Sequence, residues 1–317
     1  MYGPPAVALD EGAAIPRPTR ESFLPRLPAL ALAEVQDAHA VIHSRRLYPA
    51  HVRLSVAIVC KNNADTIGRT LDSVRHLDDD MEIIAVDSGS TDDTIPMLRE
   101  AGARVIESDW LGFVKTKNKA LAECTGEWVL ALDSDESVLP ELAEAIQHAI
   151  AEPGERAGFL VNRKVFYRGE PLNFAWQPEW RLRLIRRERF HWIGLDPHDH
   201  LAPIDGTEQI ARLVGDLRHD SIEGGFGLFL EKQSRHARTM AASMHAEGRT
   251  GSVWKLVTSP VGAFIKQAIV KQAWRDGRAG WMAAASTAAG TLMKHAALLE
   301  LHEKASGSDS VPTDRPT

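Results

Sequence analysis

The chain has 317 residues, 44% of them hydrophobic, which is enough for one large domain or two smaller ones with buried cores. Its formal net charge of −6 argues against a general nucleic-acid-binding protein, whose contact surface would be basic. Two cysteines, Cys60 and Cys124, provide neither a disulfide framework nor zinc-binding spacing.

Residues 1–50 are rich in proline and show little hydrophobic periodicity, which predicts a flexible leader in which residues 31–46 could form a helix. The basic-then-apolar layout of a secretory signal is absent at the N-terminus. The longest uncharged run near the C-terminus, Ala279–Met293, is shorter than the roughly 20 apolar residues that span a bilayer. We therefore expect a cytoplasmic protein.

From Leu54 onward, short β-branched apolar runs alternate with segments of helical periodicity. The pattern predicts strands at 54–59, 81–86, 104–107 and 128–132, and helices at 66–74, 94–101 and 112–123. This alternation favours parallel βαβ units with right-handed crossovers. Beyond residue 157 the rhythm is less regular, with strands expected at 158–167 and 181–185 and helices from 229 onward.

An acidic run follows the predicted strand Trp128–Leu132, with Asp133, Asp135 and Glu136 placed directly after it. Ligands of open α/β sheets bind outside the carboxyl ends of such strands. Carboxylates one residue apart need positive charge nearby, and Mg²⁺ that already carries phosphate oxygens fits this requirement. The alternative is a strand that runs into the acidic first turn of a helix beginning at Pro140.

A second acidic turn, Asp87–Ser88–Gly89, ends the strand predicted at 81–86. The Asp87 carboxylate could accept hydrogen bonds from a base or ribose, and Gly89 would let the backbone approach a ligand closely. The alternative is a turn-forming Asp87 with Asp92 as a helix cap. Neither a dinucleotide-binding glycine fingerprint nor a P-loop follows the first strand.

Three motifs, in this order, resemble family 2 glycosyltransferases with the GT-A nucleotide-sugar fold: CKNN at 60–63, AVDSGSTDDT at 85–94 and LDSDES at 132–137. WLGF at 110–113, Lys117–Asn118 and the DSDE run resemble, more narrowly, the bacterial lipopolysaccharide-core β-glucosyltransferase subgroup. The similarity covers roughly residues 52–230 and extends weakly to about 300. It implies a Rossmann-like α/β domain, with a mixed, mainly parallel sheet flanked by helices and a C-terminal helical extension.

The resemblance implies a role for each matching position in donor binding. Asp87 would contact the uracil or ribose, Asp133 would lie near the ribose and sugar, and Asp135 would bind Mg²⁺ or Mn²⁺ on the diphosphate. The ion would stabilise the negative charge that builds up on the leaving diphosphate. The other implied donor-binding residues are Cys60, Asn62, Ser88, Gly89, Lys117 and Asn118.

An inverting transfer also needs a general base for the acceptor hydroxyl. In the subgroup this base is an acid that often follows a histidine, and the matching stretch here is 195–200. The usual glutamate appears as Asp199, a shorter carboxylate, which leaves Asp196 as an alternative base. We favour Asp199.

The histidines allow a competing interpretation, in which His198, His200 and His219 hold zinc or iron. One His-Asp-His run lacks the helical frame of such sites. His219 also lies where the subgroup carries a histidine, so it could supply a further ligand to the diphosphate-bound ion. Its alternative is a hydrogen-bonded core histidine.

Acceptor contacts are expected around the strand predicted at 181–185, where Arg181 and Arg183 alternate with leucines and share one face. These arginines could bind anionic groups of the acceptor, such as the phosphates of a lipid-linked sugar. The alternative, which we favour, is a solvated sheet edge protected by charge. Trp176 could stack on a sugar face or pack in the core.

The segment Val253–Trp281 has five basic residues and a single acid, Asp276, together with several large apolar side chains. This composition is typical of an interfacial helix on anionic lipid. The alternative is a helical cap over the catalytic domain.

The expected organisation is a leader at 1–50, a catalytic domain at 51–230, a basic helical extension at 231–304 and a disordered tail at 305–317. We predict an inverting hexosyltransferase that is peripheral on the cytoplasmic face of the inner membrane. A nucleotide-diphosphate sugar, with UDP-sugar expected, would be the donor, and a lipid-linked glycan of cell-envelope polysaccharide or lipopolysaccharide synthesis the acceptor. The alternatives are a catalytically silent scaffold and a Mg²⁺-dependent nucleotidyltransferase, whose Gly-rich phosphate loop is missing here.

Overall fold

The computed structural model describes residues 52–195, 198–222 and 224–308. The predicted leader, the alternative base Asp196 and residues 309–317 of the predicted tail lie outside the described residues. Every element described below belongs to the unit Ala50–Thr317. The strands are β1 Leu54–Cys60, β2 Met81–Asp87, β3 Arg104–Glu107, β4 Trp128–Asp133, β5 Glu136–Val138, β6 Gly158–Tyr167, β7 Glu170–Pro171, β8 Trp180–Arg186, β9 Phe190–Leu195, β10 His198–Pro203 and β11 Ile210–His219. The helices are α1 Ala64–Val74, α2 Thr94–Glu100, α3 Phe113–Glu123, α4 Pro140–Ala151, α5 Gly225–Ala246, α6 Val253–Ile265 and α7 Gly277–Ser308, with short helical turns η1 Arg187–Arg189, η2 Lys266–Val270 and η3 Ala273–Asp276.

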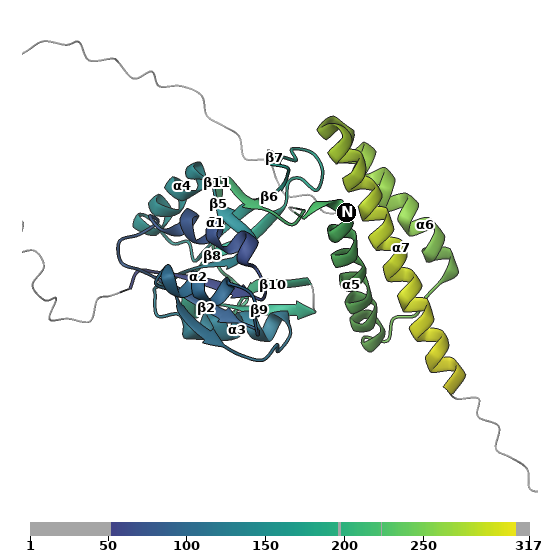
Figure 1. Ribbon diagram of the computed structural model, residues 1–317, viewed down its shortest axis with the longest axis horizontal. Helices are drawn as coiled ribbons and strands as arrows, with labels where there is room; N and C mark the ends of the chain where they lie inside the picture. Colours follow the sequence, from purple (N-terminus) through teal and green to yellow (C-terminus); the bar gives the residue numbers. More distant parts are fainter. Residues whose placement is uncertain (1–51, 196–197, 223, 309–317) are drawn as a thin grey trace, which may run out of the picture. The chain divides into compact units, whose positions relative to one another are not determined.

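The main sheet of the described residues has the strand order β3-β2-β1-β4-β8-β6-β11-β5, and β7 pairs with β6 at its side (Figure 1). The strands β3, β2, β1 and β4 are parallel neighbours, as the alternation of strands and helices in the sequence predicts. From β4 the sheet continues through antiparallel pairs with β8 and β6, and β6 then pairs in parallel with β11. The predicted α/β fold with a mixed sheet, flanking helices and a C-terminal helical extension is confirmed.

Helices cover both faces of the sheet, which explains the nearly continuous apolar sequences of β1 and β4. On one face, Val56 and Ile58 of β1 pack in a cluster with residues of α1, α2 and α4. On the other face, Ala57 packs in a cluster with residues of α3 and of the β9–β10 hairpin. The core therefore holds the carboxyl ends of β1, β2 and β4 in one fixed row.

Two features differ from the sequence-based expectations. The strand around Arg181 and Arg183 lies between β4 and β6 in the interior of the sheet, so its interpretation as a solvated edge was wrong. The acidic run does not lead directly into a helix either. Asp133 ends β4, and Glu136 already begins β5, which pairs with the last residues of β11. Asp135 therefore lies in a two-residue connection between strands.

The C-terminal helices α5, α6 and α7 form a separate layer, in which α7 packs against both α5 and α6 (Figure 1). Helix α6 has no buried residue. Helix α7 runs to Ser308, past the predicted start of the tail. In the described part of the chain, no helix combines the length and apolar character needed to cross a membrane.

Candidate active site

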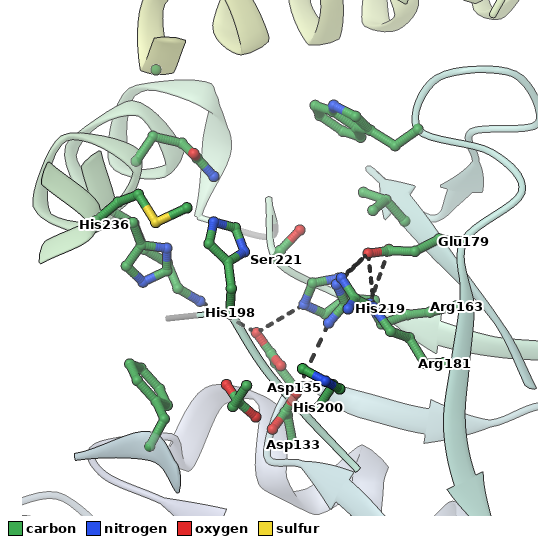
Figure 2. A pocket seen from close by; sticks show the side chains of 18 of the residues that line it. Asp133, Asp135, Arg163, Glu179, Arg181, His198, His200, His219, Ser221 and His236 are labelled. Carbon is green, nitrogen blue, oxygen red and sulfur yellow. Dashed lines mark hydrogen bonds and ion pairs between the residues drawn. The ribbon is translucent and has the colours of Figure 1, made fainter. Parts of the chain in front are cut away.

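A cavity of about 1290 Å³ lies at the carboxyl end of β4 and collects most of the residues singled out from the sequence. The strands and loops of the sheet contribute one part of its wall, including Cys60, Lys117, Asp133, Asp135, Trp176, Arg181, Arg183, Asp199 and His219. Helices α5 and α7, together with the turn η2, contribute the other part. Figure 2 shows the acids and histidines facing the same space.

The acids that follow β4 are held by buried arginines. Glu136 is fully buried and accepts hydrogen bonds from Arg183 at 2.5 Å and from Arg163 at 3.4 Å. Arg183 also donates to Asp133 Oδ2 at 2.9 Å, and its side chain is only 4% exposed. Arg183 therefore neutralises Asp133 and Glu136 of the acidic run. The sequence had suggested that it contacts the acceptor. Burial alone would raise the pKa of Asp133, but Lys117, Arg183 and Arg163 hold it well below its usual range.

The Lys117 ammonium group pairs with both Asp133, the predicted sugar contact, and Asp199, the predicted base. Lys117 Nζ lies 2.8 Å from Asp133 Oδ1 and 2.7 Å from Asp199 Oδ2. The Lys117 and Asp199 side chains are each 8% exposed, and the lysine lies over the Trp192 ring at 4.5 Å from its centroid. The second oxygen of Asp199 has no hydrogen-bond donor among the described residues, so it is free to accept a proton.

The β9–β10 hairpin that carries Asp199 is fixed by two further residues. Asn118 donates to Trp192 O and accepts from Trp192 N, both at 2.9 Å, so its amide holds the hairpin, and its expected contact with the donor stays a prediction. Gly194 pairs with Asp199 across the hairpin and has a φ of +111°. A Cβ at Gly194 would lie 2.6 Å from the carbonyl oxygen of His198, so only glycine fits there.

Asp135 lies beside two potentially cationic groups. Its Oδ2 is 3.5 Å from His219 Nε2 and 3.4 Å from Lys232 Nζ (Figure 2). Burial opposes ionisation, but His219 and Lys232 hold the pKa of Asp135 well below its usual range. His219 Nδ1 is buried without a hydrogen-bond partner among the described residues.

This donor set fits a divalent ion that brings further ligands with it. An ionised carboxylate is an accepted ligand of Mg²⁺ or Mn²⁺, and substrate phosphates commonly complete the shell. Within residues 52–195, 198–222 and 224–308, no group of three or more His, Cys, Asp or Glu side chains is arranged to hold a metal. The alternative zinc or iron site built on His198, His200 and His219 is therefore not supported.

The turn after β2 is organised by Asp87. Its Oδ1 accepts the backbone N–H groups of Gly89 at 2.9 Å and Ser90 at 2.7 Å, and its Oδ2 accepts from the Ser90 hydroxyl. Asp87 is fully buried, and it does not line the cavity, nor do Ser88 and Gly89. A direct bond from Asp87 to a nucleotide base would replace one of these internal hydrogen bonds.

The end of β1 reaches the cavity through Cys60, Lys61 and Asn63, whereas Asn62 is turned away. Asn62 has a φ of +53°, and its Oδ1 accepts from Thr91 N at 2.8 Å. Burial, followed by the nearby Asp87, raises the pKa of the Cys60 thiol and keeps it neutral.

Trp176 and Arg181 line the cavity, but both already have partners. Trp176 Nε1 donates to Thr287 Oγ1 at 2.9 Å, and its ring lies 5.8 Å from the Phe229 ring. Arg181 lies 2.6 Å from Glu179, which also contacts Arg163 at 2.7 Å (Figure 2). Burial alone would raise the pKa of Glu179, but Arg163 and Arg181 lower it to about 2.

Several cavity residues were not predicted: Arg163, Glu179, Trp192, Lys232, His236, Gln267 and Lys294. They are scattered over β6, β9, α5, η2, α7 and the segment before β8, and no local spacing marks them. Burial, then Arg181 and Lys294, lowers the pKa of His198, and burial with Lys232 lowers the pKa of His236. Both imidazoles are thereby favoured in the neutral form.

Part of the chain, including the three acids of the site, matches a known protein family. Residues 55–204 match the family described as glycosyl transferase family 2. This segment runs from β1 to the end of β10, so it includes Asp133, Asp135 and Asp199 but none of the helices α5–α7.

Individual relatives are about a quarter identical to this chain over the aligned residues. An uncharacterized glycosyltransferase of Rickettsia prowazekii is 27% identical over 69% of the chain and 77% of its own length. The lipopolysaccharide core biosynthesis glycosyltransferase LpsC of Rhizobium meliloti is 26% identical over 78% of the chain and 93% of its own length. Among solved structures, the mannosyltransferase PcManGT of Pyrobaculum calidifontis, in complex with GDP-Man and Mn²⁺, matches with 19% identity, 86% coverage of each chain and a TM-score of 0.43.

Proposed function

The chain carries a glycosyl transferase family 2 domain and is a glycosyltransferase, and from this premise we propose that it transfers a hexose from a nucleotide-diphosphate sugar to a lipid-linked glycan with inversion at the anomeric carbon. The observation that carries the proposal is the placement of Asp133, Asp135 and Asp199 around one cavity. The family supports sugar transfer over the nucleotidyltransferase alternative. The name of LpsC supports an acceptor in lipopolysaccharide core synthesis.

Donor binding is proposed at the sheet side of the cavity. Asp133 would accept hydroxyl hydrogen bonds from the ribose or sugar, because Lys117 and Arg183 keep its carboxylate ionised and oriented. Asp135 and His219 would hold Mg²⁺ or Mn²⁺, which when bound would stabilise the negative charge of the leaving diphosphate. Lys232 could then turn from Asp135 to a phosphate oxygen, since its side chain is 42% exposed.

We assign the general base to Asp199. The acceptor hydroxyl would give its proton to the free oxygen of this carboxylate as the hydroxyl oxygen bonds to the anomeric carbon. The bond from that carbon to the diphosphate breaks at the same time, and its electron pair leaves with the nucleotide. Lys117 positions Asp199 through the opposite oxygen, so the geometry of the base is set before the acceptor arrives.

A panel of nucleotides tests the donor assignment. Calorimetric titration with UDP, GDP, CDP, dTDP and ADP, each with and without Mn²⁺, should show one nucleotide that binds in a metal-dependent way. We expect it to be UDP. If none binds with Mn²⁺ present, the chain is better explained as a scaffold protein that has lost donor binding.

Asp199→Asn is expected to lower turnover by about 10²–10⁴-fold, the usual contribution of a general base. The nucleotide affinity should stay close to wild type, because Lys117 keeps Asp133 as a partner. Asp199→Glu is the matched variant and should keep most of the turnover, since it retains a carboxylate. Steady-state rates and nucleotide titrations measure both effects. Near-normal turnover in Asp199→Asn would move the base to another acid, with Asp196 the next to test.

We further propose that helix α6 docks on anionic lipid. Val253, Val257, Val261, Ile265 and Ile269 recur every fourth residue along α6 and η2, and each is at least 50% exposed. Residues at this spacing share one face of a helix. A continuous exposed apolar face of this kind marks an interaction site.

The charges around this face favour a bilayer as the occupant. Lys255, Lys266 and Arg278 are exposed along the same segment, although the chain as a whole carries a net charge of −6. Trp254, which is 76% exposed, suits the boundary between headgroups and acyl chains. A lipid-linked acceptor would then lie in the same membrane surface on which α6 docks.

Trp254→Ser combined with Val257→Ser should weaken binding to phosphatidylglycerol vesicles by at least about tenfold, because burying one large apolar side chain contributes about 1.5–3 kcal/mol. Val214→Ser, at a 67% exposed position of β11, is the control and should bind as wild type. Co-sedimentation with anionic and with neutral vesicles measures the effect. A dimer that dissociates in the double variant, without any vesicle binding by wild type, would identify α6 as a self-association surface instead.

A further inference from the structure

The part of the cavity wall that comes from α7 is polar, although this helix belongs to a layer with much exposed apolar surface. Ser286, Gly290 and Lys294 lie four residues apart on α7 and all line the cavity, together with the adjacent Thr287 and Thr291. Such spacing brings side chains to one face of a helix. This face therefore presents small, hydrogen-bonding residues and one long cation to the same space that Asp133 and Asp135 face from the sheet.

Two arginines on the sheet side of the cavity, Arg181 and Arg183, are already neutralised. Arg183 contacts Asp133 and Glu136, and Arg181 contacts Glu179. They are therefore poorly suited to bind an anionic acceptor, which was the functional role considered for them from the sequence. Lys294 differs, because it has no acidic partner within ion-pair distance among the described residues. The side chains that interact electrostatically with Lys294 include Arg249, His198 and His295, which are all basic.

A second group on the same wall also lacks a partner. Gln267 of η2 is 6% exposed and lines the cavity, and its Nε2 has no hydrogen-bond acceptor among the described residues. Buried side-chain donors are nearly always satisfied, so an unpaired one beside a cavity indicates a missing acceptor atom. The neighbouring Lys266 is exposed and lines the cavity too. Lys294, Gln267 and Lys266 are all donors, and a bound anion would satisfy each of them.

We propose that this wall is the acceptor subsite and that it binds an anionic group of the acceptor glycan, a phosphate or a carboxylate, through Lys294 and Gln267. The inference rests on the proposed function, since it assigns the second substrate of the same cavity. The donor diphosphate is assigned to Asp135 and His219, on the other side of the cavity. Burial and Arg249 lower the pKa of Lys294, and a bound anion would oppose that shift.

Three small glycosides serve as probes for this subsite: methyl glucoside, methyl glucoside 6-phosphate and methyl glucuronide. Each is titrated into the full chain after saturation with Mn²⁺ and the nucleotide selected by the panel. At least one charged probe should bind about tenfold or more tightly than the neutral one, the usual gain from a charged hydrogen bond. Preference for the phosphate or for the uronate identifies which anion the acceptor carries.

Lys294→Gln should remove this preference, with binding of the charged probe falling to the level of the neutral probe. Lys294→Arg should keep most of it. Lys304→Gln makes the same charge change at an exposed position of the same helix and should leave the preference intact. Equal binding of the three probes to wild type, binding of none of them, or an unchanged preference in Lys294→Gln would each overturn the proposal.

Nucleotide titrations on the same variants separate this inference from the proposed function. Lys294→Gln should bind the nucleotide and Mn²⁺ as wild type does. If that variant instead loses nucleotide affinity, Lys294 belongs to the donor site and the acceptor subsite is refuted, while the glycosyltransferase assignment stands. If the wild-type chain shows no metal-dependent nucleotide binding, the proposed function itself fails.

Discussion

Replacement of Asp135 by alanine is expected to abolish metal-dependent nucleotide binding and to lower turnover by about 10³-fold or more. The variant removes the one carboxylate that lies beside His219 and faces the cavity from the connection between β4 and β5. A bound divalent ion contributes several kcal/mol of charge stabilisation, which corresponds to a rate factor of about this size. Calorimetric titration with and without Mn²⁺, followed by rate measurements, tests the expectation.

Two controls sharpen this test. Asp205→Ala removes an acid from an exposed loop outside the cavity and should bind the nucleotide as wild type does. Chelation of the ion from the wild-type protein should reproduce the binding defect of Asp135→Ala. If Asp135→Ala still binds the nucleotide in a metal-dependent way, Asp135 is not the metal ligand and its place at the diphosphate must be given up.

Arg183→Met is expected to destabilise the fold by about 3–5 kcal/mol, the usual result of leaving a buried charge without its partner. Glu136 is fully buried and would keep the Asp133 N–H hydrogen bond at 3.0 Å, but its remaining ion pair among the described residues would be the longer one to Arg163, at 3.4 Å. Arg181→Met in the same strand, β8, is the matched control. The Arg181 side chain is 40% exposed and Glu179 keeps Arg163, so its loss should cost less than about 1 kcal/mol. Urea denaturation of both variants gives the comparison.

Combining Arg183→Met with Glu136→Gln should restore part of the lost stability, because the second change removes the unpaired charge. The double variant also keeps the test usable if Arg183→Met alone does not fold. A cost for Arg183→Met no larger than that for Arg181→Met would show that the buried pair is not a stabilising element of the β4–β8 region.

The parts of the fold with local signals could be predicted from the sequence. Apolar runs such as 54–59 and 128–132 are long enough to indicate buried strands, and the order of strands and helices indicates parallel pairing. The position of Asp133 and Asp135 at a strand end followed from the same pattern. The β9–β10 hairpin was not predicted, because its residues alternate poorly and its register depends on Gly194 meeting Asp199.

The partners of individual side chains could not be predicted, because they lie far apart in the sequence. Lys117 and Asp199 are separated by 82 residues and meet only after α3 and the hairpin pack on one face of the sheet. For Arg183, the period-two pattern did not show the irregular pairing of β6 with β8 at this point, which interrupts the alternation along β8. It carried no information on whether that strand lies at an edge or in the interior, and the interior position decides that the arginine pairs with buried acids.

The cavity is shared between two stretches of chain that are separate in sequence. Residues 55–204 match the family and supply the acids, whereas the opposite wall comes from α5, η2 and α7, which all lie beyond residue 224. If the proposed acceptor subsite is correct, an exchange of the segment that begins at Gly225 between related enzymes should change which acceptor is used, while Asp133, Asp135 and Asp199 stay in place. Such an exchange would also replace Lys232, so retention of Lys232 in the grafted α5 is part of the design.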